Sequence, residues 1–146
     1  MLSLKKMKAD NYLVDFGDLD PITYIHLRTA SGLSAKTLEA AQIGLANSIC
    51  SVIALDIDNN QPVGMGRIIG DKGCHCQIVD ICVLPSHQKN GLGKRIMKKL
   101  KEYIDNALPA SCYISLVADG DAYKLYAQYG FEEVWPTSRG MALLKK

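Results

Sequence analysis

The segment 83–94 combines glycines and lysines in an order that suits an anionic ligand. Its sequence is VLPSHQKNGLGK, in which Gly91 and Gly93 open a long amphipathic pattern. The first turn of a helix leaves backbone N–H groups unpaired and carries about half a unit of positive charge, so phosphate groups bind there. Glycine has no Cβ atom to hold a pyrophosphate away from these amides. The pattern predicts a pyrophosphate-binding loop, to which Lys89 and Lys94 add positive charge.

Spacing excludes two other phosphate-binding loops. A Walker loop needs a hydroxyl residue after Gly-Lys, whereas Gly93-Lys94 is followed by Arg95. It also needs a glycine where Gln88 stands. A dinucleotide-binding fingerprint needs a third glycine where Ile96 stands. Neither class of nucleotide site fits this segment.

A second motif lies in the segment 119–131, where DGDA is followed by YAQYGF with three residues between them. Together with Gln-x-x-Gly-x-Gly after Val-x-Pro, it resembles the GNAT N-acetyltransferases, and the similarity covers residues 48–146. Asp119 stands where that family usually has Asn. The resemblance implies acetyl-CoA as cosubstrate and no metal. It also implies these cofactor contacts: Ile81, Cys82, Val83, Gln88, Lys89, Asn90, Gly91, Leu92, Gly93, Lys94 and Asp119.

Tyr126 and Asp80 are the residues that we expect to move protons. A thiol leaving group has a pKa of about 8.5 and tyrosine of about 10, so Tyr126 can protonate or stabilise the departing sulfur. The resemblance places its hydroxyl at that sulfur. Asp80 is the one acidic residue in the apolar run 78–83, and desolvation makes a buried carboxylate a stronger base. An acid at this position resembles the plant and cyanobacterial arylalkylamine acetyltransferases; a charge that caps a β-bulge or pairs with Arg67 stays open as the alternative.

The five cysteines are an odd number, and we expect free thiols. Cys74-x-Cys76 lacks the paired spacing of a zinc site. Cys82 is expected to be a small buried hydrophobe, with an acyl-cysteine route as the alternative. A thiol or metal sensor is a further alternative for the segment 74–82.

Alternation and helical periodicity predict a mixed α/β fold of one domain, residues 1–146. The expected element order is βααβββαβαββ, a GNAT-like, mostly antiparallel mixed sheet with splayed central strands, flanked by helices. Ser34 is expected to cap the second helix. Strands are expected at 12–15, 48–56, 62–69, 74–84, 113–117, 131–134 and 141–144, and helices at 21–30, 35–47, 91–107 and 122–129.

Length, charge and hydropathy exclude several classes of function. At 146 residues and a formal net charge of +2, the chain lacks the strongly basic character of nucleic-acid-binding proteins. Its longest apolar runs, such as 49–55, are far shorter than the roughly 20 residues of a membrane span. The start carries Lys5, Lys6 and Lys8 without an apolar segment after them, unlike a secretory signal, so a cytoplasmic location is expected.

The acceptor is expected to be the primary amine of a small molecule, acetylated by direct transfer in a ternary complex. A basic protein tail would favour an acidic groove, and no acidic run is present. Arg28, Ser31, Ser34 and Arg67 are candidates for the acceptor pocket. The alternatives are acetylation of a protein or peptide amine, and a non-catalytic module that binds CoA or a protein. A homodimer stays open.

Overall fold

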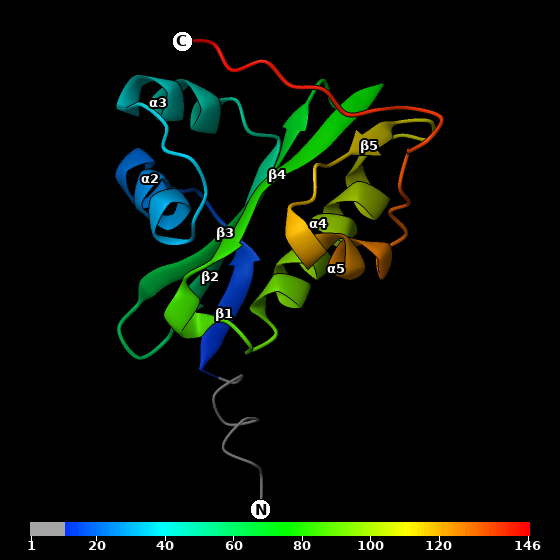
Figure 1. Cartoon of the computed structure of the whole chain (residues 1–146). Helices are drawn as coiled ribbons and strands as arrows, with labels where there is room; N and C mark the ends of the chain where they lie inside the picture. Colours follow the sequence, from blue (N-terminus) through cyan, green and yellow to red (C-terminus); the bar gives the residue numbers. More distant parts are fainter. Residues whose placement is uncertain (1–10) are drawn as a thin grey trace, which may run out of the picture. The chain divides into compact units, whose positions relative to one another are not determined.

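The protein is described by a computed structural model that covers residues 11–146 (Figure 1). By its contacts the chain divides into two compact units, Met1–Leu116 and Val117–Lys146. The single-domain assignment stays a prediction. The lysine-rich start expected not to be a secretory signal lies outside the described residues. No helix within 11–146 has the length and apolar character needed to cross a membrane.

The larger unit is built on a five-stranded mixed sheet. The strands are β1 (Tyr12–Phe16), β2 (Cys50–Asp56), β3 (Gln61–Gly70), β4 (His75–Val83) and β5 (Tyr113–Ser115), and they lie in sequence order across the sheet. The pairs from β1 to β4 are antiparallel, and β4 pairs with β5 in parallel. The predicted α/β class, with a mostly antiparallel mixed sheet, is confirmed.

Strands β4 and β5 are paired only at one end. Their register joins His75 to Tyr113 and runs no further than Gln77 opposite Ser115. The remaining residues of β4, up to Val83, have no strand partner on that side among the described residues. This agrees with the expected splaying of the central strands, and it leaves a row of β4 backbone groups available to a ligand.

Two short helices lie on one face of the sheet, and one long helix lies on the other (Figure 1). The first, α2 (Pro21–Ala30), begins as predicted: Asp20 accepts hydrogen bonds from the Ile22 and Thr23 amides, and proline occupies the first turn. The second, α3 (Leu38–Ala46), is capped by Thr37. The prediction of a Ser34 cap was wrong, because the Ser34 carbonyl and hydroxyl both accept hydrogen bonds from Arg28.

The long helix α4 (Leu92–Ala107) covers the opposite face with the apolar stripe that its periodicity predicts. Four of its side chains are buried: Leu92, Ile96, Met97 and Leu100. It contacts β1, β2, β3 and β4, so the segment that precedes it is held over the end of β4. A short 3₁₀ turn, η1 (Pro85–His87), joins β4 to this segment.

The smaller unit holds a 3₁₀ turn, η2 (Gly120–Ala122), and a short helix, α5 (Tyr123–Ala127). The two strands predicted at 131–134 and 141–144 are absent from the described structure, which corrects the end of the expected element order. Backbone groups at the first of these segments close turns: the Phe131 amide donates to the Tyr126 carbonyl, and the Ser138 amide donates to the Val134 carbonyl. Met141 and Leu143 are 92% and 96% exposed, so they form no buried strand face.

Candidate functional site

Strand β4 contains an irregularity at its only acidic residue. Val79 pairs with Arg67 of β3, and the next paired residue is Cys82, opposite Met65. Asp80 and Ile81 therefore form a β-bulge opposite a single residue of β3. Asp80 has φ = 63°, a left-handed backbone that costs a non-glycine residue about 1–3 kcal/mol and persists only where surrounding contacts impose it.

The contacts that hold Asp80 are a buried cluster of ionic and polar side chains. Arg28 Nη1 lies 2.5 Å from Asp80 Oδ1, and Arg67 Nε lies 2.7 Å from Oδ2. The Tyr24 hydroxyl donates to Oδ2 at 2.9 Å. The two arginine side chains are each 9% exposed and the aspartate side chain 6%. We call these four residues the Asp80 cluster.

The environment of Asp80 differs from the sequence expectation. An apolar setting was expected, whereas two guanidinium groups compensate the charge that burial penalises. The alternatives of a bulge position and an ion pair with Arg67 are therefore both found in the structure.

The same two arginines connect the helices α2 and α3 to the sheet. Arg28 Nε donates to the Ser34 carbonyl at 2.8 Å, beyond the end of α2. Arg67 Nη1 donates to the Gly44 carbonyl at 3.1 Å and to the Ser48 hydroxyl at 2.7 Å, at the end of α3. These hydrogen bonds hold the helical pair α2–α3 onto β3 and β4. Arg28 and Arg67, which were expected in the acceptor pocket, therefore have a structural role here.

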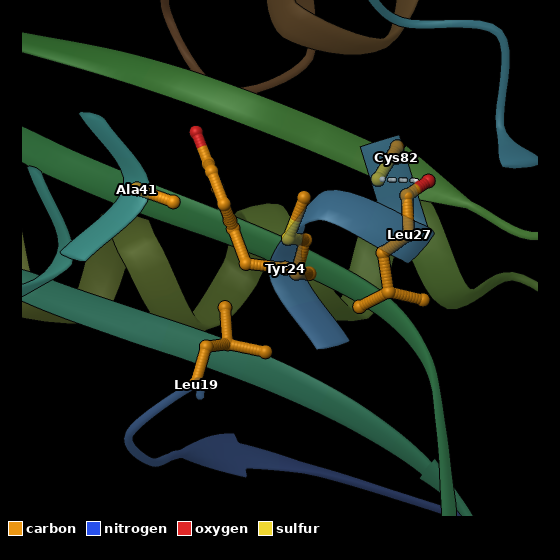
Figure 2. Close-up of a cluster of buried hydrophobic side chains, with 6 residues drawn as sticks. Leu19, Tyr24, Leu27, Ala41 and Cys82 are labelled. Carbon is orange, nitrogen blue, oxygen red and sulfur yellow. Dashed lines mark hydrogen bonds between the residues drawn. The ribbon is translucent and has the colours of Figure 1, made fainter. Parts of the chain in front are cut away.

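Tyr24 is the member of the site that sequence reasoning missed. It is 3% exposed, and burial together with the negative charge of Asp80 raises the pKa of its hydroxyl above the ordinary value. Its position four residues before Arg28 places both side chains on one helix face, which is the signal that could have identified it. Figure 2 shows Tyr24 within the apolar cluster of Leu27 and Cys82.

Cys82 and Ser31 both lie near the C-terminal end of α2. Cys82 is buried, its thiol donates to the Leu27 carbonyl at 3.6 Å, and burial raises its pKa to about 11 (Figure 2). A neutral thiol dominates near pH 7, which disfavours the acyl-cysteine alternative. Ser31, a predicted acceptor contact, is the C-terminal cap residue of α2, and its hydroxyl oxygen is buried.

The loop before α4 is shaped by its own side chains. Gln88 Nε2 donates to the Val83 carbonyl at 3.0 Å, and Asn90 Nδ2 donates to the His87 carbonyl at 3.0 Å. These two predicted cofactor contacts therefore direct their side chains to the loop backbone. Lys89, at φ = 65°, and Gly91, at φ = 75°, both have left-handed backbones. The loop is thus a tight turn, with polar side chains used to fix its course.

The start of α4 fits a pyrophosphate group. The N-terminal cap residue of the helix is Gly91, which has no side chain, so among the described residues the start of α4 lacks the hydrogen bond that a capping side chain would supply. A Cβ atom added at Gly91 would meet nothing within 4 Å, which marks open space in front of this turn. Lys89 and Lys94 are exposed beside it. Acetyl-CoA, whose pyrophosphate and pantetheine need such amides and an unpaired strand edge, fits this loop and β4.

Tyr126 and Asp119 belong to the smaller unit. Tyr126 is 8% exposed. Burial, with the negative charge of Asp119 as the second cause, raises the pKa of its hydroxyl above the usual value of 10. The hydroxyl therefore keeps its proton throughout the neutral range, which is the state that a proton donor requires.

A pocket of about 430 Å³ lies on the α2 side of the larger unit. It is bounded by α2, by the turn between β2 and β3, and by the segment after β4. The lining residues include two histidines and no Asp, Glu, Lys or Arg: Ile22, Thr23, His26, Asn59, Gln61, Pro62, Val63, Leu84 and His87. Within residues 11–146, no group of three or more His, Cys, Asp or Glu side chains is arranged to hold a metal ion.

Comparison with known protein families identifies the family of this chain. The family described as acetyltransferase (GNAT) domain matches residues 28–141, so the chain belongs to the GNAT acetyltransferases. The predicted family and the predicted enzyme class, an N-acetyltransferase, are confirmed.

Relatives from bacteria, plants and algae are similar over most of the chain. A probable acetyltransferase from meticillin-resistant Staphylococcus aureus has a solved structure with a TM-score of 0.85 and 41% identity, covering 92% of this chain and 99% of that one. GCN5-related N-acetyltransferase 1, chloroplastic, of Arabidopsis thaliana is 26% identical over 95% of this chain and 77% of its own length. The N-acetyltransferase ycf52 of Pyropia yezoensis is 29% identical over 84% and 70%.

Removing the charge of Asp80 is expected to destabilise the fold. Asp80→Asn leaves two buried guanidinium groups with a neutral partner, which should lower the free energy of unfolding by about 3–5 kcal/mol. The matched control is Asp105→Asn, which removes an exposed partner of Lys101 and should cost about 0.5 kcal/mol or less. Urea unfolding followed by circular dichroism measures both. A loss at Asp80 as small as that at Asp105 would contradict the structural role of the cluster.

Proposed function

We propose that this acetyltransferase moves an acetyl group from acetyl-CoA to the primary amine of a small molecule, with both substrates bound at once. The observation that carries the proposal is the bulged strand β4. Its one carboxylate lies at the bulge, its edge beyond Gln77 has no strand partner within residues 11–146, and it leads through the turn η1 toward the start of α4.

The residues that would hold acetyl-CoA follow from this geometry. The amides of Leu92 and Gly93 would bind the pyrophosphate at the start of α4, and Lys94 would add positive charge beside it. Gln88 and Asn90 would contribute by fixing the loop, because their side chains are engaged with its backbone. The unpaired edge of β4 at 81–83 would accept the pantetheine arm as an added strand. Acetyl-CoA supplies an acetyl group activated as a thioester.

Proton transfer is assigned to two side chains. Asp80 would accept the proton of the substrate ammonium group, and Arg28 and Arg67 would hold the direction of its carboxylate. Tyr126 would return a proton to the departing sulfur, and its raised pKa supports this role because the hydroxyl is protonated at neutral pH. An amide of the bulge at Ile81 or Cys82 would stabilise the thioester oxygen.

The pocket beside α2, whose lining residues do not include Asp80, has the size and polarity of a binding site for a small molecule. A basic protein tail would need carboxylates to compensate its charge, and none lines this pocket among the described residues. The hydroxyl, amide and imidazole groups of Thr23, Gln61 and His26 can hydrogen-bond a compact polar molecule, while Val63 and Leu84 contact its apolar part.

Cofactor binding should depend on open, uncharged space at Gly91. Gly91→Asp would place a carboxylate beside the pyrophosphate and should weaken acetyl-CoA binding by about tenfold or more, equivalent to about 1.4 kcal/mol. Gly91→Asn is the matched control, because Asn has the same size and tolerates the left-handed backbone but carries no charge. Isothermal calorimetry measures the dissociation constants. Equal constants for the two variants would refute the assignment of this loop.

Loss of the Tyr126 hydroxyl should lower turnover much more than it lowers the affinity for acetyl-CoA. Tyr126→Phe removes the proton donor and should lower kcat by about 10²-fold or more, with the acetyl-CoA dissociation constant changed little. Tyr123→Phe, at an exposed position on the same helix, is the control and should leave kcat unchanged. Thiol release is measured across a panel of small amines. An unaltered kcat for Tyr126→Phe would remove it from the mechanism, and cofactor binding without thiol release from any amine would favour a non-catalytic module.

A further inference from the structure

Two cysteines from distant parts of the sequence lie in contact beside the paired ends of β4 and β5. Cys76 Sγ and Cys112 Sγ are 3.7 Å apart, although the residues are 36 positions apart in the chain. Cys76 belongs to β4, and Cys112 directly precedes β5. The strands around them are fixed, because the Tyr113 amide donates to the Cys74 carbonyl at 2.8 Å. Both thiols are free in this structure.

The surroundings of the pair hold one thiol in place and leave the other accessible. Cys76 is 4% exposed, and Gly70 of β3 packs so closely that an added Cβ would lie 3.0 Å from its sulfur and 2.3 Å from the His75 carbonyl oxygen. Only glycine permits this close approach of the β3 backbone to Cys76. Cys112 is half-buried, so a small reagent can reach it.

We propose that Cys76 and Cys112 form a reversible disulfide on reaction with a low-molecular-weight disulfide such as oxidised glutathione. A disulfide needs its sulfurs about 2.05 Å apart, and side-chain rotation of two thiols already in van der Waals contact supplies the remaining approach. The Cys112 thiolate attacks one sulfur of the reagent, whose S–S bond breaks and releases one glutathione thiolate. The Cys76 thiolate then attacks the Cys112 sulfur and displaces the second glutathione.

The exchange balances without any further reactant. The two cysteine thiols lose two electrons and two protons, and the reagent becomes two thiols. Burial is the main cause that raises the pKa of the Cys112 thiol, with Cys76 as a second cause. Because only the thiolate attacks, the reaction should be slow at pH 7 and accelerate as the pH rises.

The bond would regulate the acetyl-transfer site, and this consequence rests on the proposed function. The disulfide would join β4 to the start of β5 within the short stretch where they pair, next to the point where β4 loses its partner. It would restrict how far the two strands separate there. Formation of the disulfide itself does not depend on acetyl transfer, so the two proposals can fail separately.

Peptide mapping of the folded full-length protein tests the proposal. The protein is incubated with oxidised glutathione at pH 8.5, alkylated to block remaining thiols, and digested with trypsin without reduction. We expect the tryptic peptide 73–89 to be linked to the peptide 102–124, with a mass lower by two hydrogens than the sum of the two. Dithiothreitol should reverse the link, and the oxidised protein should have a higher Tm than the reduced protein.

Because the peptide 73–89 contains three cysteines, variants are needed to identify which of them forms the disulfide. Cys74→Ser, which removes the exposed neighbouring thiol, should keep the cross-link in full. Cys76→Ser should abolish it, as should Cys112→Ser. The proposal is overturned if the folded wild type gives only glutathione adducts, or if the cross-link survives in Cys76→Ser. Circular dichroism confirms that each variant is folded before oxidation.

Discussion

The ion pairs between Asp80 and two arginines are the interaction on which the larger unit depends. Asp80 belongs to β4, Arg67 to β3 and Arg28 to α2, so one carboxylate joins two strands and a helix. The outer donors of the arginines reach the Ser34 carbonyl and the end of α3. Burying these charges is favourable only because each has its partner. The position of the helical pair on the sheet therefore depends on the charge at one residue.

The same residue sets the shape of β4. Its left-handed backbone interrupts the ladder with β3, and the strand continues toward Val83 after the bulge. Beyond Gln77 the other edge of β4 has no strand partner among the described residues, and the strand ends at the turn that leads into α4. A single strand thus presents a carboxylate on the α2 side, free backbone groups at its edge, and a helix start at its end. The proposed acetyl transfer uses these three features of β4.

Sequence reasoning found the parts of the site that depend on local pattern. The glycine loop, the amphipathic stripe of α4 and the Asp20 cap each rest on neighbouring residues, and the structure contains all of them. A bulge at Asp80 was one of the predicted alternatives, because burying a carboxylate in an apolar strand costs free energy unless the charge has a partner. Its second partner, Arg28, lies 52 positions away, and no local pattern indicates that contact. Tyr24 shares a helix face with Arg28, but its contact with Asp80 spans 56 positions, so the local spacing places the two helix residues together without indicating their partner.

The predictions that failed depended on competition between local and tertiary contacts. Ser34 has the right chemistry for a helix cap, but Arg28 takes both of its oxygens and Thr37 caps α3 instead. The segments 131–134 and 141–144 have strand-like composition, yet a strand forms only where a neighbouring strand supplies backbone hydrogen-bond partners. Periodicity indicates which residues can form a strand and does not supply that partner.

The central claim, that Asp80 takes the proton of the acceptor amine, is tested most directly by the pH dependence of turnover in Asp80→Asn. Turnover is measured from pH 7 to pH 10 with saturating acetyl-CoA, at a temperature where circular dichroism shows the variant to be folded. An amine with a pKa near 10 deprotonates by itself as the pH rises, so the variant's deficit relative to the wild type should shrink steadily toward pH 10. A deficit that stays constant across the range would show that Asp80 acts only by holding the fold.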